Sequence, residues 1–167
     1  NTVIWTRGNE VFRITPRENN EVNSSWMPDS HRLNFHYLHA ETRLGDPFVK
    51  IGSKHEISDW PGAIAKTAEE LSRFKGEEVA VIGSGRMTNE ELYLLRRLAD
   101  TLETDLLSLV PRVGESDGKL ISADRNPNTS GAKLIWASRN PYAKLKSIRQ
   151  GVVTGKIKAL IVFYEDL

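Results

Sequence analysis

Cysteine is absent from all 167 residues of this chain. Without a thiol the chain can form no disulfide framework and can perform no thiolate chemistry. It also lacks the thiolates that ordinarily ligate iron–sulfur clusters and many structural zinc ions. We therefore expect these residues to hold no cofactor and no metal ion that depends on cysteine ligands.

Long apolar runs and an excess of one charge are missing as well. No apolar stretch approaches the roughly 20 residues of a membrane-spanning helix, and no secretory signal opens the sequence. Basic and acidic residues number 23 and 22 and are interspersed, for a net charge of +1. We expect a soluble, intracellular chain with no direct membrane insertion and no electrostatic footprint for nucleic acid.

The length and the distribution of patterns predict two parts. The chain could form one ordinary domain, or a small domain plus most of a second. It begins at Asn1 rather than Met and ends shortly after an apolar run, so we expect a piece of a larger polypeptide. We predict a small β-rich module at 1–57, followed at 58–167 by an open α/β domain with a mainly parallel sheet.

The first part has short β-prone runs. Residues 2–6 and 10–14 flank Gly8, which predicts a hairpin, and residues 48–51 predict a further short strand.

Three histidines fall in a predicted short helix at 31–42: His31, His36 and His39. Imidazoles grouped in this way could hold a divalent metal. No carboxylate stands at a familiar ligand spacing, however, and aromatic residues lie between the histidines. This pattern favours packing against the small sheet.

The stretch from Glu77 to Leu102 is the one around which the second part is organised. Residues 78–82 form a short apolar run, typical of a strand buried on both faces. Gly83-Ser84-Gly85 ends the run, and Thr88-Asn89-Glu90-Glu91 has the form of a capping box that begins a helix. An apolar stripe follows at helical spacing: Leu92, Leu95, Ala99 and Leu102. Strand, glycine turn and capped helix make half of a βαβ unit.

A glycine turn before a helix can bind phosphate, because the helix N-terminus offers free N–H groups. A dinucleotide fingerprint, however, needs a third glycine where Thr88 stands, and the phosphate-loop motif is also absent. Ser84 lacks the Gly-x-Ser-x-Gly context of a nucleophile, and the histidines lie in the other part. We therefore predict a tight structural turn and no catalytic residues.

Further segments of the second part have the patterns of regular elements. They are a helix with a buried face at 59–75 (Ile64, Ala68, Leu71 and Phe74), a strand at 105–110, a helix at 141–154 and a buried strand at 157–163. Residues 111–131 form a long irregular segment whose polar stretch 124–129 could grip a polar ligand or simply make turns.

Several segments resemble the molybdopterin oxidoreductase superfamily. These segments are Glu10 to Arg17, Val22 to Arg32, Gly83 to Glu91, Ser122 to Thr129 and Ile157 to Leu167. Within the superfamily they are most similar to the large iron–sulfur (G) subunit of respiratory complex I, the NADH:quinone oxidoreductase. The asparagine-rich loop with Trp26 is the most specific part of this resemblance.

The departures from the family pattern concern its cofactors. Members with a [4Fe–4S] cluster use three cysteines upstream and a fourth in a Trp-x-Cys-Asp-x-Gly-Arg segment, where this chain has Pro28, with His31 in place of the glycine. Molybdenum enzymes of the family often have a Cys or selenocysteine near residues 110–114, and none is present. The resemblance thus implies a vestigial pterin-type loop, made of Gly83, Ser84, Gly85, Arg86 and Asn89.

The resemblance implies a scaffold in the peripheral electron-transfer arm, with no redox centre of its own. The parent polypeptide would carry iron–sulfur clusters. The partners would be the remainder of that polypeptide and other peripheral-arm subunits, on the cytoplasmic side of the bacterial inner membrane. Two alternatives stay open: a fragment of a molybdopterin-dependent oxidoreductase such as a formate dehydrogenase, and a non-enzymatic interaction module.

Overall fold

The structure is a computed structural model that describes residues 2–119 and 121–166. The chain divides into two compact units, Asn1–Ala63 and Ile64–Leu167. Helices and strands alternate along it, with small antiparallel sheets first and a parallel sheet later, so the predicted α/β class is confirmed. The boundary at 57/58 stays a prediction. Within the described residues, no helix combines the length and apolar character needed to cross a membrane.

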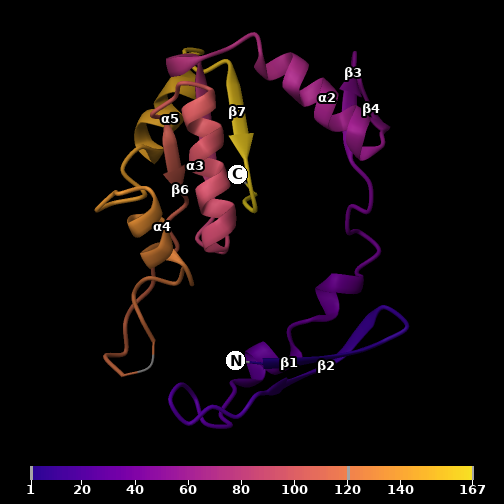
Figure 1. Ribbon diagram of the computed structural model, residues 1–167, viewed down its shortest axis with the longest axis vertical. Coiled ribbons are helices and arrows are strands. Elements are labelled where there is room, and N and C mark those ends of the chain that lie inside the picture. Colours follow the sequence, from indigo (N-terminus) through magenta and orange to yellow (C-terminus); the bar gives the residue numbers. More distant parts are fainter. Residues whose placement is uncertain (1, 120, 167) are drawn as a thin grey trace. The chain divides into compact units, whose positions relative to one another are not determined.

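The first unit contains two hairpins (Figure 1). β1 (Thr2–Arg7) pairs antiparallel with β2 (Glu10–Pro16), and the turn between them places Gly8 and Asn9 at φ angles of 57° and 65°. This hairpin confirms the prediction. β3 (Phe48–Ile51) was also predicted, but its partner β4 (Lys54–Ile57) was not.

The predicted helix at 31–42 is wrong as a continuous element. The structure has a short α1 (Asp29–Leu33) and a 3₁₀ turn η1 (His36–His39). Between them Asn34, at φ −86° and ψ 65°, and Phe35, at φ −128°, leave the helical region. Asparagine disfavours helix interiors because its side chain competes for backbone hydrogen bonds.

The second unit is built on a three-stranded parallel sheet in the order β6-β5-β7. β5 (Val79–Gly83) lies in the centre, with β6 (Leu107–Leu109) on one side and β7 (Ala159–Val162) on the other. The predicted buried strand at 78–82 is confirmed, since every residue of β5 is buried. β7 differs from its prediction because Leu160 and Val162 are exposed.

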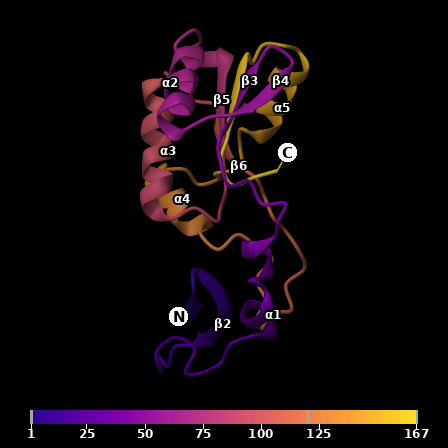
Figure 2. The same cartoon turned by 90° about the vertical axis from the view of Figure 1, so that its right-hand side faces the viewer.

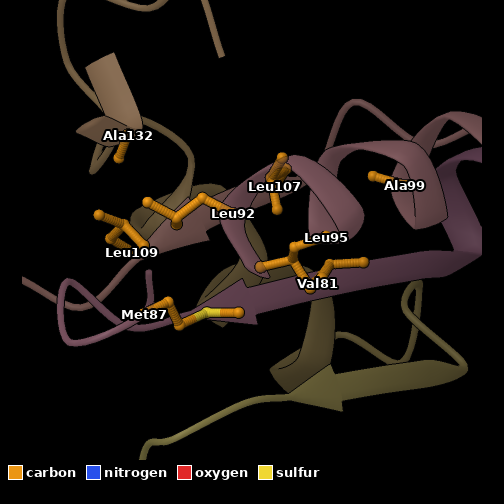
Figure 3. Packing of buried hydrophobic residues seen from close by; sticks show 8 residues of the cluster. All are labelled: Val81, Met87, Leu92, Leu95, Ala99, Leu107, Leu109 and Ala132. Atoms are coloured by element: carbon orange, nitrogen blue, oxygen red, sulfur yellow. The ribbon is translucent and has the colours of Figure 1, made fainter. Parts of the chain in front are cut away.

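Two helices cover opposite faces of the central strand (Figure 2). Val81 of β5 packs with α3 (Asn89–Thr101), whereas Ala80 and Ile82 pack with Ile148 of α5 (Leu145–Val153). Successive side chains of a strand point to opposite faces, so the sheet has a core on each side. Figure 3 shows the α3 side, where the predicted stripe of that helix meets Leu107 and Leu109 of β6.

Three expectations for this part of the chain are wrong. α2 (Trp60–Leu71) forms, but it contains no buried residue and Ile64 is 62% exposed. A periodic pattern identifies the apolar side of a helix but not whether anything covers it. The irregular segment at 111–131 contains the start of α4 (Thr129–Ile135).

The third correction concerns Pro141, which precedes α5 rather than opening it. Pro141 is buried, and its carbonyl accepts a hydrogen bond from Leu109 N at 2.9 Å. The outer edge of β6 is thereby covered by the turn before α5, as exposed strand edges usually must be.

Candidate functional site

The strand order points to the carboxyl edge of the parallel sheet. In open α/β sheets, ligands bind beyond the carboxyl ends of the strands, where the winding of the chain reverses. From β5 the chain passes to β6 on one side and then returns to β7 on the other, so the reversal lies between β5 and β7. The loops after these two strands, residues 84–88 and 163–166, therefore define the candidate site (Figure 1).

The glycines of the first loop are required by close packing. A Cβ atom on Gly83 would lie 2.5 Å from a methyl carbon of Leu95, and one on Gly85 would lie 2.5 Å from Cβ of Asn126. Neither glycine has a positive φ. We expected these glycines to form a tight structural turn. The structure explains them by close contact with Leu95 and Asn126, and not by a backbone conformation that favours glycine.

The remaining loop residues bind other parts of the same unit. The amide nitrogen Nδ2 of Asn128 donates to the carbonyl of Met87 at 2.8 Å and to Oδ1 of Asn89 at 3.0 Å. Ser84 is fully buried, and its hydroxyl accepts from the Arg86 N–H at 3.2 Å. Four residues of the predicted pterin-type loop (Gly83, Ser84, Gly85 and Asn89) are thus engaged by the chain itself, while the Arg86 side chain is exposed.

A buried ion pair at the carboxyl edge of the sheet joins the segment after β6 to the loop after β7. Both terminal guanidinium nitrogens of Arg112 donate to the Glu165 carboxylate at 2.7 Å, and the Glu165 side chain is only 1% exposed. Arg112 follows β6, and Glu165 follows β7. Two-point pairing of this kind fixes both side chains in one geometry. This edge of the sheet therefore contains a carboxylate of the chain itself.

The environment holds that carboxylate ionised. Burial alone raises the pKa of Glu165, but hydrogen bonds from Arg112 and the Ser84 hydroxyl, with the positive charges of Arg112 and Arg86, lower it further than burial raises it. The net effect places the pKa of Glu165 below its usual value. Within the chain, the carboxylate of Glu165 and the guanidinium of Arg112 thus neutralise each other.

The N-terminus of α3 is capped by the chain as well. Thr88 Oγ1 accepts from the Glu91 N–H, and the Glu91 carboxylate accepts from the Thr88 N–H at 2.7 Å, so the predicted capping box is confirmed. Tyr164 donates its hydroxyl to Glu91 at 2.7 Å. These bonds, that from Thr88 first, lower the pKa of Glu91. The helix end that could have bound phosphate has a carboxylate beside it.

The polar stretch at 124–129 is hydrogen-bonded to the segment that follows β6. Nδ2 of Asn126 donates to the Val110 carbonyl at 3.0 Å and to the Tyr142 hydroxyl at 3.1 Å. The Tyr142 hydroxyl lies 2.7 Å from Oγ1 of Thr129. We expected this stretch either to grip a polar ligand or to make turns. The structure shows its polar side chains in hydrogen bonds within the chain.

Pro28 lies in the other unit, in a cavity of about 210 Å³ lined by Thr2, Val22, Asn23, Trp26, Met27, Pro28 and His31. The proline side chain offers no donor atom to a metal. Across residues 2–119 and 121–166, no three His, Asp or Glu side chains are grouped to hold a metal ion. His39 instead accepts a hydrogen bond at Nε2 from the Val11 N–H at 2.9 Å.

The sequence identified the glycine loop but did not identify the Arg112–Glu165 ion pair. From the sequence, Glu165 is only an acid beyond the last strand, and nothing in its own neighbourhood singles out Arg112. A usable signal exists, because residues just after parallel strands meet at one edge of the sheet. Arg112 and Glu165 each stand three residues beyond the end of their strand.

The chain resembles known proteins in both units. Residues 1–36 match the family described as the NADH-ubiquinone oxidoreductase NDSU1/NuoG-like 4Fe-4S domain. The G subunit of the NADH-quinone oxidoreductase from Rickettsia conorii is 30% identical over 125 residues, which is 75% of this chain and 18% of that relative. The mitochondrial 78 kDa subunit of NADH-ubiquinone oxidoreductase from Candida albicans is 31% identical over 107 residues, 63% of this chain and 15% of that relative.

A protein with a different name also matches. Probable oxidoreductase YjgC of Bacillus subtilis is 26% identical over 100 residues, 58% of this chain and 10% of that relative. The chain spans less than a fifth of the length of each of these relatives.

The description of the matched family raises the question of a [4Fe–4S] cluster. Such clusters are held by cysteine thiolates. The chain has no cysteine, and Pro28, whose side chain cannot ligate iron, stands where the family resemblance would place one. The residues present therefore do not fit a cluster, although the family description associates the longer relatives with one.

The similarity to these relatives extends over most of the chain and agrees with the resemblance predicted from the sequence. The chain is a NuoG-like fragment and belongs to the family of the NADH-quinone oxidoreductase G subunits.

Proposed function

We propose that this chain is a structural segment of the parent subunit that carries no electrons itself. The observation that supports this most directly is the Glu165–Arg112 pair, which lies at the edge where an α/β sheet of this order would bind a ligand and binds both side chains to each other. The absence of cysteine supports the same role for the first unit, because no thiolate is available to a cluster.

The parent polypeptide would carry iron–sulfur clusters outside these residues, as the family description suggests. Its partners would be the remainder of the polypeptide and the other peripheral-arm subunits of an NADH:quinone oxidoreductase. Such an assembly would lie on the cytoplasmic side of a bacterial inner membrane. In that assembly the chain would have a structural role. We assign it no activity, because a fold by itself implies none.

A turnover measurement tests the absence of redox function. The purified chain would be incubated anaerobically with iron and sulfide, and then assayed for oxidation of NADH or formate with an artificial electron acceptor. We expect no stoichiometric brown chromophore and no rate above that of a heat-denatured control. Either a bound cluster or measurable turnover would contradict the proposal.

A nucleotide titration addresses the molybdopterin alternative, which the names of the relatives do not favour. A pterin cofactor of that family would place a nucleotide near residues 84–88. We expect calorimetry with a guanine nucleotide to give no saturable heat, because Glu165 already occupies both terminal nitrogens of Arg112. Saturable micromolar binding to the unmodified chain would favour the alternative.

A further inference from the structure

Positive charge is concentrated in one segment of the second unit. Residues 126–164 contain no acidic residue and seven basic ones: Lys133, Arg139, Lys144, Lys146, Arg149, Lys156 and Lys158. The net charge of the whole chain is +1, so the other residues carry an excess of acid. The expectation of interspersed charge holds for the chain as a whole but not for this segment.

The basic side chains lie around two adjoining hollows. Lys133 and Arg139 line one of them, together with Leu134 and Ala137. Lys144 lines the other, which has a volume of about 270 Å³ and is also lined by the acidic Asp105 and by Arg96, the ion-pair partner of Asp100. Ser138 lines both hollows, so the surface is continuous from α4 through the following turn to the start of α5.

The outward side of α5 continues this surface. Ile148 is 1% exposed and packs on Ala80 and Ile82, which fixes the inward side of the helix. Lys146 and Arg149 are three residues apart, lie together on the outward side and are exposed. We call the exposed side chains of α4, α5 and the turn between them the α4–α5 surface.

The charges of the α4–α5 surface are largely unpaired. Among the described residues, the seven basic side chains of the segment make one ion pair, between Lys156 and Glu77 at 2.6 Å. Exposed apolar side chains stand beside them: Leu134 is 82% exposed and Val153 is 75% exposed. A surface that combines unpaired charge of one sign with exposed apolar groups is typical of an interaction site.

We propose that the α4–α5 surface binds an acidic segment of a partner protein that also presents apolar side chains. Carboxylates would pair with Lys133, Arg139 and Arg149, while apolar groups would cover Leu134. Protein is favoured over single-stranded nucleic acid because that ligand calls for exposed stacking aromatics. The aromatic that lines the second hollow, Trp136, is half-buried and donates its indole N–H to the Leu92 carbonyl at 3.0 Å. The inference goes beyond the structural role proposed above and holds whatever the parent polypeptide does.

The test uses the whole chain, labelled with ¹⁵N, and a defined probe. The probe is a synthetic helical peptide with glutamates on one face and leucines on the other, titrated at physiological salt. A second peptide has glutamine in place of each glutamate. We expect the acidic peptide to shift amide signals in residues 130–153 and to bind at least tenfold more tightly than the glutamine peptide.

Charge reversal localises the effect. Lys133→Glu, Arg139→Glu and Arg149→Glu together should weaken binding of the acidic peptide at least tenfold. The matched control reverses Arg17, Arg43 and Lys54 to Glu, three exposed residues of the other unit, and should change the affinity less than twofold. All six positions are exposed, and unchanged NMR spectra elsewhere would show that both variants fold.

Three outcomes would overturn the proposal. The first is no shift at residues 130–153 with the acidic peptide. The second is an equal loss of affinity in the control variant, which would show that binding depends only on the net charge of the chain. The third is tighter binding of a duplex DNA oligonucleotide, or of phosphatidylglycerol vesicles, to the same residues at the same salt concentration, which would identify a different class of partner.

Discussion

The Glu165 carboxylate is buried, and Arg112 is its ion-pair partner. Removing one partner of a buried pair leaves an uncompensated charge, which costs far more than replacing both. Arg112 is about one-third exposed, so water screens part of this cost. We expect Arg112→Met to lower the free energy of unfolding of the second unit by about 2 kcal/mol. Urea denaturation, followed by NMR signals of residues 79–109, would measure this change.

A double-mutant cycle provides the control. The variant Arg112→Met with Glu165→Gln should be more stable than Arg112→Met alone, with a coupling of about 1–3 kcal/mol. Because the pKa of Glu165 is lowered in the folded state, its contribution is present above the unfolded carboxyl pKa and is lost as the pH falls through the folded value. The stability difference between the unmodified chain and Glu165→Gln should therefore shrink in acid. A difference that grows in acid would contradict this role.

His39 acts as a hydrogen-bond acceptor for the first hairpin, since its Nε2 accepts from Val11 N. An imidazole nitrogen that accepts a hydrogen bond carries no proton. We expect His39→Ala to speed hydrogen exchange of the Val11 amide, and His39→Gln to preserve part of the protection because its carbonyl can also accept. His36→Ala is the control, since the ring of His36 packs against Phe35 instead. Equal exchange rates at Val11 in all three variants would contradict the assignment.

At the scale of elements, the capping box at the start of α3 stabilises the helix that covers one face of the sheet. Thr88→Ala should lower the free energy of unfolding of the second unit by about 1 kcal/mol, whereas Thr88→Ser should restore most of it. Thr101→Ala, at the other end of the same helix, should have little effect because alanine is the better helix former. Circular dichroism during chemical denaturation would measure all three. An equal loss at both ends would indicate that capping is not the cause.

The elements that could be predicted are those whose signals are local. The buried run of β5, the Thr88–Glu91 box and the apolar stripe of α3 each lie within a short window, and the structure has all three. The break between α1 and η1 had only a weak local signal, because Asn34 disfavours a helix interior without excluding it.

The candidate site depended on distant residues and could be predicted only in part. Arg112 and Glu165 are 53 residues apart in the chain and meet only through the strand order. The sequence did not indicate which strand lies between the other two. The exposure of α2 could not be predicted either, because it depends on what covers the helix.

At the scale of the whole molecule, β7 offers both an outer edge and an uncovered apolar face. Within the described residues it pairs only with β5, and its side chains Leu160 and Val162 are 40% and 37% exposed. Unpaired strand edges recruit other strands, and lysine suppresses this pairing. We expect the chain to self-associate, and Leu160→Lys with Val162→Lys to reduce the association at least severalfold. Light scattering across a concentration series would measure it.

Lys66→Arg on α2 serves as a control that keeps the charge of a half-buried side chain, and it should leave the association unchanged. If the lysine variant associates as strongly as the unmodified chain, β7 is not the contact. Adding the remaining part of the parent polypeptide should also suppress self-association if that part covers β7.

The order β6-β5-β7 also has a consequence for synthesis on the ribosome. Val79 of the central strand pairs with Ala159, 80 residues further along the chain. At roughly 5–20 residues per second, β7 is translated several seconds after β5, α3 and β6 have formed their local contacts. During that interval one edge of β5, every residue of which is buried in the folded unit, has no partner in the nascent chain. Protection of that edge by a ribosome-associated chaperone would then determine how much of the polypeptide reaches the folded state.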